Sequence, residues 1–91
     1  MPAVARVGDA GQDGTYSGYI VSGSANVIAD GIEVAFVGST YYCSNPLHGY
    51  NEIVSSPVTD VIVNGNAIAV VGSTCACGAT IIQGSPDVLA G

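Results

Sequence analysis

A repeated hairpin unit is the feature that most constrains the fold of this chain. The stretch from Pro57 to Thr74 holds two apolar runs joined by Asn64-Gly65. Asn and Gly tolerate the positive φ angles that both central residues of a type I′ turn require, so this pattern predicts a β-hairpin. The segment from Ala25 to Thr40 repeats the same order of runs around Asp30-Gly31. The chain therefore contains at least two copies of one hairpin unit.

The two ends of the chain resemble the two halves of a third copy. Gly84–Gly91 matches the first strand of the unit, and Pro2–Asp9 matches the second strand. Three similar hairpins, the third closed by the joined termini, predict an all-β ring with pseudo-threefold symmetry. Such a ring needs no open edge strand, which removes an aggregation liability. A solenoid of stacked repeats is the competing interpretation, but a solenoid has no need for a repeat that is split between the termini.

Composition narrows the classes of fold and partner. The 91 residues are expected to form one small domain, residues 1–91, and no stretch has the apolar period of a substantial helix. Arg6 is the only basic residue against seven acidic ones, for a net charge of −6. This balance argues against binding to nucleic acid or to anionic lipid head groups.

The chain shows neither an 18-residue apolar run nor the pattern of a signal peptide, so we expect no transmembrane helix and no secretion signal.

Three connectors separate the hairpins, and two of them carry every Cys and the only His. The connectors are Ala10–Ser22, Tyr41–Ser55 and Cys75–Gln83. Each starts just after the second strand of a unit, so a threefold arrangement makes all three converge at one end. The candidate metal ligands on these connectors are Cys43, His48, Cys75 and Cys77.

Three thiolates and one imidazole make a full tetrahedral set for Zn²⁺, with Fe²⁺ as the alternative. An odd number of cysteines without a secretion signal favours metal ligation over disulfides. A closed four-ligand site is structural and couples metal binding to folding, whereas a set of only three ligands leaves a position open for catalysis. The alternative interpretation is that these residues are ordinary buried thiols and a surface His.

No other group of residues predicts catalysis. A nucleophilic pair of Cys43 and His48 is conceivable, but its context matches no activated thiol arrangement. We interpret Asp9, Asp13 and Asp30 as turn and surface residues. Tyr41-Tyr42 is expected to pack on the loops and the metal site.

The repeat, its register and the Cys/His connectors together resemble a PAAR-repeat protein. The resemblance covers nearly the whole chain, beginning at Pro2-Ala3-Val4-Ala5-Arg6, which replaces the Pro-Ala-Ala-Arg of the family. Many members carry a His in the first connector, where this chain has Thr15 and Tyr16. The ligand set implied here is therefore rich in Cys, and the matching positions are again Cys43, His48, Cys75 and Cys77.

This resemblance implies a structural protein rather than an enzyme. Family members form a short pointed cone with a metal ion near its vertex, and they cap a trimeric β-helical spike. The spike is a VgrG-type protein of type VI secretion systems or the central spike of a contractile phage tail. The implied role is to sharpen the spike for piercing a cell envelope, with the target membrane met only transiently and effector proteins as further partners.

The implied location is the cytoplasm before assembly and then the tip of a contractile injection apparatus, or a phage virion tail. Many members carry toxic extensions, whereas this chain ends within its third repeat, so we expect no effector domain of its own. Two other hypotheses remain open from the residues alone. One is a small metal-binding enzyme or thiol protein, and the other is a β-rich binding module without metal.

Overall fold

The structure is a computed structural model that describes residues 2–90, and this part of the chain is all-β. It contains no helix, and hence none that could cross a lipid bilayer. The expected all-β fold is confirmed. The strands are β1 (Ala10–Asp13), β2 (Tyr16–Ile20), β3 (Ile28–Ala29), β4 (Ile32–Glu33), β5 (Thr40–Cys43), β6 (Gly49–Ser55), β7 (Ile62–Val63), β8 (Asn66–Ala67), β9 (Thr74–Cys75) and β10 (Thr80–Ile81).

The two predicted hairpin turns are present. Strands β3 and β4 pair across Asp30-Gly31, and β7 and β8 pair across Asn64-Gly65. All four turn residues have positive φ, from 52° at Asn64 to 83° at Gly65, as a type I′ turn requires. The paired strands are only two residues long, because the rest of each apolar run leaves the hairpin to join a central ring.

Three alanines form this ring at the centre of the molecule. The amide of Ala5 donates to the carbonyl of Ala69, Ala35 donates to Ala5, and Ala69 donates to Ala35, at 2.9, 2.9 and 3.0 Å. All three residues are fully buried. Because each alanine stands at the same position of its repeat, the cyclic bonding confirms the pseudo-threefold arrangement. The small methyl groups suit the crowded axis.

The joined ends of the chain form the third hairpin. Val4 donates its amide to the carbonyl of Val88 at 3.0 Å, as Val34 does to Val27 and Ile68 does to Val61. A further bridge pairs Ala3 with Leu89. The predicted third copy is therefore confirmed over the described residues, while Gly91 lies outside them.

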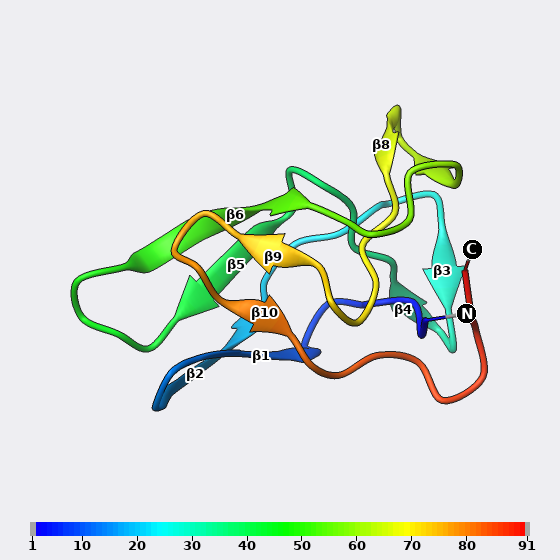
Figure 1. Ribbon diagram of the computed structural model, residues 1–91. Helices are drawn as coiled ribbons and strands as arrows, with labels where there is room; N and C mark the ends of the chain where they lie inside the picture. The colour runs from blue at the N-terminus through cyan, green and yellow to red at the C-terminus, as the bar shows by residue number, and fades with distance from the viewer. Residues whose placement is uncertain (1, 91) are drawn as a thin grey trace.

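The connectors form a closed six-stranded sheet, in the order β1-β10-β9-β6-β5-β2. The sequence predicts only connectors here, but each one folds back as an antiparallel hairpin. The tight turns use Gly14, Gly49 and Gly78, all with positive φ. Figure 1 shows the three turns of this sheet at one end of the molecule, with β3, β4, β8 and both chain ends spread at the other.

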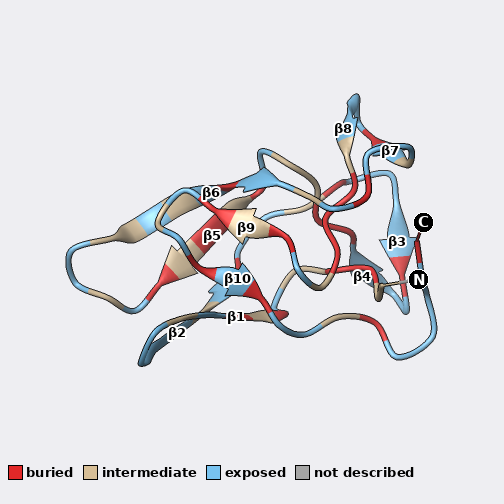
Figure 2. Ribbon diagram, in the orientation of Figure 1, coloured by how far each residue is buried: buried red, intermediate tan, exposed pale blue. Residues whose placement is uncertain are grey.

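Buried residues follow the long axis of the molecule, in two clusters (Figure 2). One cluster fills the closed sheet and the other lies under the hairpins. The closed sheet departs from the pseudo-threefold symmetry at one core position. The buried ring of Tyr41 fills the space beside Gly11 and Gly18, which have no side chains. A Cβ atom on Gly11 would lie 2.6 Å from the Tyr41 hydroxyl oxygen.

Arg6, the only basic residue, ties the repeats together. Its Nε lies 3.1 Å from Oδ2 of Asp9, and its Nη1 lies 3.2 Å from Oδ2 of Asp30 in the β3–β4 turn. Asp30 also accepts a hydrogen bond from Ser85. The network links the N-terminal segment, the first hairpin and the C-terminal segment, and Asp9 is a buried turn residue rather than a surface one.

Candidate metal centre

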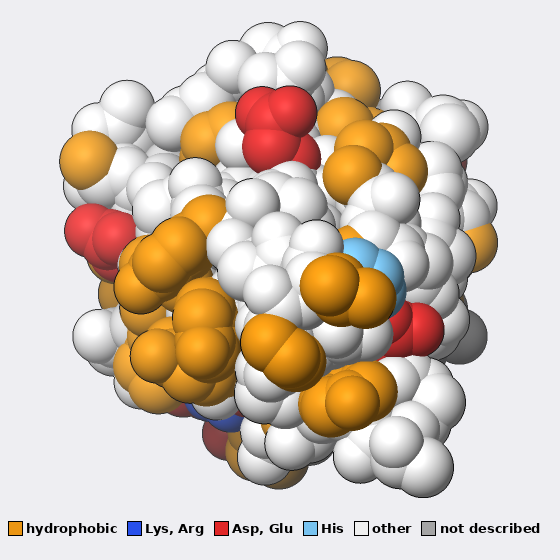
Figure 3. Space-filling view, turned by 90° about the vertical axis from the view of Figure 1, so that its left-hand side faces the viewer, with side chains coloured by type: hydrophobic (Ala, Val, Ile, Leu, Met, Phe, Trp, Pro, Cys, Tyr) orange, Lys and Arg blue, Asp and Glu red, His pale blue; other side chains and the backbone are white. Residues whose placement is uncertain are grey.

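Four potential ligands meet at the end of the closed sheet where its three turns lie. One ligand atom from each of Asp13, Cys43, His48 and Cys77 lies within 4.8 Å of all the others. Figure 3 views this end of the molecule, where the histidine and an acidic side chain lie among exposed hydrophobic side chains. The predicted convergence of the connectors therefore occurs, and all three of them contribute to the group.

The distances within the group fit a compact four-ligand centre. Nδ1 of His48 lies 3.0 Å from Oδ2 of Asp13 and 3.7 Å from Sγ of Cys43. The ligands of a tetrahedral Zn²⁺ lie about 3.3–3.8 Å apart, given ligand bonds of about 2.0–2.3 Å. Thiolate, imidazole and carboxylate are all ligands that Zn²⁺ and Fe²⁺ accept. The residues present therefore fit a divalent metal, and small shifts would complete the centre.

A short loop brings His48 back over Cys43. Asn45 accepts from the amides of Leu47 and His48, through its side chain and its carbonyl at 3.0 and 2.9 Å. Gly49 then turns with a φ of 60° and pairs with Cys43. These local bonds hold the imidazole next to the thiol at the end of β5.

Cys77 reaches the same point from the β9–β10 turn. The amide of Ala76 donates to the carbonyl of Glu52 at 2.8 Å, and Gly78 donates to Cys75 at 2.9 Å. The turn is therefore anchored to β6 on one side and closed on itself. The thiol of Cys77 is half-buried, whereas the thiol of Cys43 is fully buried.

Asp13 is the member of the group that sequence reasoning missed, because it was interpreted as a turn or surface residue. The signal was present in the repeat register. Asp13 follows Asp9 by four residues, just as Cys43 follows Ser39 and Cys77 follows Ser73. The three positions are equivalent in the three repeats, so the pseudo-symmetry directs all three side chains to one axis.

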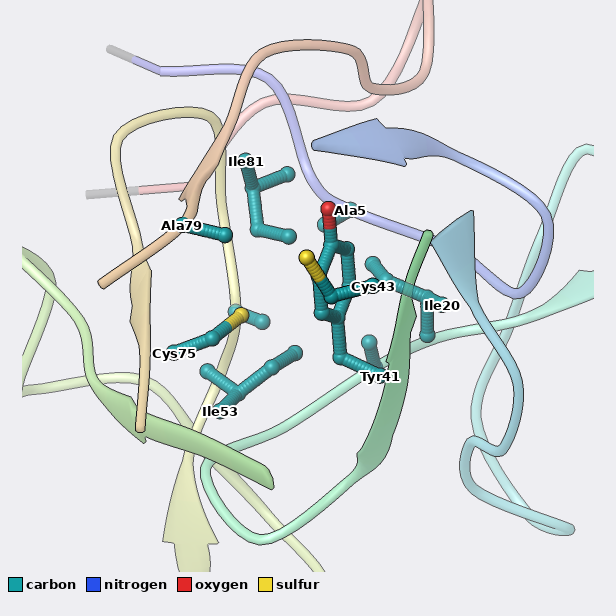
Figure 4. Close-up of a cluster of buried hydrophobic side chains, with 10 residues drawn as sticks. Ala5, Ile20, Tyr41, Cys43, Ile53, Cys75, Ala79 and Ile81 are labelled. Atoms are coloured by element: carbon teal, nitrogen blue, oxygen red, sulfur yellow. The ribbon is translucent and has the colours of Figure 1, made fainter. Parts of the chain in front are cut away.

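Cys75 lies close by but outside this group. Its side chain is buried in the core of the closed sheet with Ile53 and Ala79 (Figure 4). Burial, with the charges of Cys77 and Cys43 adding to it, raises the pKa of the Cys75 thiol to about 12. Burial also raises the pKa of Cys43. Ligation by Cys75 stays a prediction, and the structure supplies Asp13 as an alternative fourth ligand.

The hydroxyl of Tyr41 lies in the same core. It is buried and has no hydrogen-bond partner among residues 2–90. Burial raises the pKa of Tyr41, and the neighbouring charges of Cys75, Cys43, Cys77 and Asp13 raise it further. The hydroxyl is therefore a neutral, unpaired donor close to the candidate metal centre.

Comparison with known proteins agrees with this architecture. No curated protein matches the chain closely enough to serve as a relative. The family model described as PAAR motif matches residues 8–83, which include the whole closed sheet and all four residues of the group. The match to this family supports a structural role for the protein at a spike tip in secretion or phage systems. The chain belongs to the PAAR motif family.

Proposed function

We propose that this protein is a non-enzymatic tip that caps a trimeric β-helical spike and sharpens it for piercing a cell envelope. The spike is a VgrG-type protein or the central spike of a phage tail. The observation that carries the proposal is the threefold hydrogen-bond ring of Ala5, Ala35 and Ala69. It lets one chain present three similar surfaces to a partner with true threefold symmetry.

The docking surface that we propose consists of the exposed apolar residues at one repeated position of the hairpins. Ile28, Ile62 and Leu89 are equivalent in the repeat register and are 52%, 58% and 50% exposed. Their neighbours Ala29, Val63 and Ala90 point into the core. Similar exposure at all three positions suits a partner that offers the same apolar contact three times.

The metal centre supplies rigidity at the opposite end. A metal held by Asp13, Cys43, His48 and Cys77 would join the turns of all three connectors, which arise from distant parts of the chain. Metal binding of this kind contributes directly to the free energy of folding. Such a link would brace a mechanically loaded tip, because it joins turns that are far apart in the sequence.

The proposed life cycle follows from this role. The protein is made in the cytoplasm and joins the end of a contractile injection apparatus or of a phage virion tail. Effector proteins are further proposed partners, and contact with the target membrane is transient.

The test is binding of the purified protein to a recombinant spike trimer, followed by the mass of the complex. We expect one chain of this protein for each trimer, because one pseudo-threefold face covers one threefold end. Ile62→Asp should weaken binding at least about tenfold, since it places a charge in an apolar contact. Leu47→Asp is the matched control, because Leu47 is 90% exposed and lies in the turn at the other end.

Two results would count against the proposal. One is a complex with three chains per trimer, which would mean that each chain binds a side surface. The other is an equal loss of binding in Ile62→Asp and Leu47→Asp.

A further inference from the structure

We propose that Cys43 and Cys77 form an oxidative cross-link site, in which a disulfide joins the second and third connectors at the end of the closed sheet where its three turns lie, when no metal holds them together. The sulfur atoms of these residues lie within 4.8 Å of each other. The residues occupy equivalent positions in two repeats, so both side chains point to the same axis. The sulfurs have to approach each other by at most about 2.8 Å to reach the S–S bond length of about 2.0 Å.

The third cysteine is kept out of this reaction by its position. Cys43 and Cys77 both belong to the group of ligand atoms that lie within 4.8 Å of one another, whereas Cys75 lies outside that group and packs against Ile53 and Ala79. The three cysteines therefore divide into one adjacent pair, Cys43 and Cys77, and one thiol outside the group, Cys75. The pairing follows from the fold, since sequence spacing alone would bring Cys75 and Cys77 together first.

The exposure of the two thiols sets the order of the reaction. Cys77 is half-buried and accessible, whereas Cys43 is buried behind it. The sulfur of Cys77 attacks one sulfur of a low-molecular-weight disulfide and releases one thiol. The sulfur of Cys43 then attacks the Cys77 sulfur, forms the Cys43–Cys77 bond and releases the second thiol. The two cysteine protons end on the released thiols, and the two electrons reduce the oxidant.

The cross-link and the metal compete for the same two sulfurs. A sulfur in a disulfide cannot act as a thiolate ligand, and a metal-bound thiolate is a poorer nucleophile. The same link between the second and third connectors can therefore be made by a metal or by a covalent bond. The protection by metal rests on the proposed metal centre, whereas the cross-link itself depends neither on that centre nor on spike docking.

The experiment treats the full chain with a chelator and then with oxidised glutathione. We expect the number of titratable thiols to fall from three to one, and peptide mapping to find Cys43 joined to Cys77. The melting temperature should rise by about 10 °C or more, because the bond closes a long loop. Cys75→Ala should form the same cross-link, and Cys77→Ser should form none.

Zn²⁺ added before the oxidant should slow the cross-link at least about tenfold. If the cross-link forms equally fast with Zn²⁺, the competition is wrong and the metal centre loses support, while the cross-link site stands. A bond between Cys75 and Cys77, a stable glutathione adduct, or three thiols that persist would each overturn the cross-link site itself.

Discussion

His48 and Asp13 face each other across two connectors, with Nδ1 of His48 3.0 Å from Oδ2 of Asp13. The first connector carries no Cys and no His, yet it reaches the same point as the other two. A carboxylate at this position would give the candidate centre a harder ligand than a third thiolate. It also ties the N-terminal repeat to the other two, so that a metal would close the full ring of turns.

The first prediction separates the two possible ligand sets. Asp13→Ala should lower Zn²⁺ affinity by more than the 10–100-fold typical of residues that only support a ligand. Cys75→Ala should leave the affinity within about threefold of the original, because Cys75 lies in the core outside the group. Competition titration with a chromogenic chelator measures both. A large loss in Cys75→Ala with none in Asp13→Ala would restore the set of three cysteines and one histidine.

The second prediction concerns the only basic residue. Arg6→Ala should lower the free energy of unfolding by about 2–3 kcal/mol, because it leaves the buried carboxylate of Asp9 without its charged partner. Urea denaturation of the protein gives this value directly. Asp60→Ala, at an exposed position, is the control and should change stability by less than about 0.5 kcal/mol. Similar losses in the two variants would mean that the Arg6 network contributes little.

The third prediction addresses the unpaired hydroxyl of Tyr41. In chelator-treated protein, Tyr41→Phe should be neutral or should stabilise the fold by about 1 kcal/mol, since it removes a buried polar group that has no partner within residues 2–90. The ring itself stays, so the packing against Gly11 and Gly18 is kept. A loss of more than about 1 kcal/mol would show that the hydroxyl has a bonding partner.

The fourth prediction is a loss of stability at high pH in chelator-treated protein. The pKa of Cys75 is raised from 9.0 to about 12 in the fold. The unfolded thiol therefore ionises first, and the free energy of unfolding should fall as the pH rises from about 9 towards 12. Stability below pH 9 is unaffected by this residue. Denaturation curves at several pH values test this, and Cys75→Ala should show a shallower decline than the original protein.

Local chemistry explains why much of the architecture could be predicted from sequence. Asp30-Gly31 and Asn64-Gly65 accept positive φ wherever they stand, so the hairpins and their register follow from short segments. The third hairpin at the chain ends follows from the same repeat, and so does the convergence of the connectors. The convergence of the connectors also predicts that Cys43, His48 and Cys77 lie near one another.

The membership of the candidate metal centre depends on the tertiary structure. Which side chains reach the axis depends on how the connectors pair as a closed sheet, and on the space that Tyr41 fills beside Gly11 and Gly18. Those constraints place Asp13 with the other potential ligands and leave Cys75 outside that group. The sequence alone determined the repeat, its turns and its ring, because these depend on local backbone preferences. The positions of ligand atoms depend on contacts between segments far apart in the chain, and only the folded structure settles them.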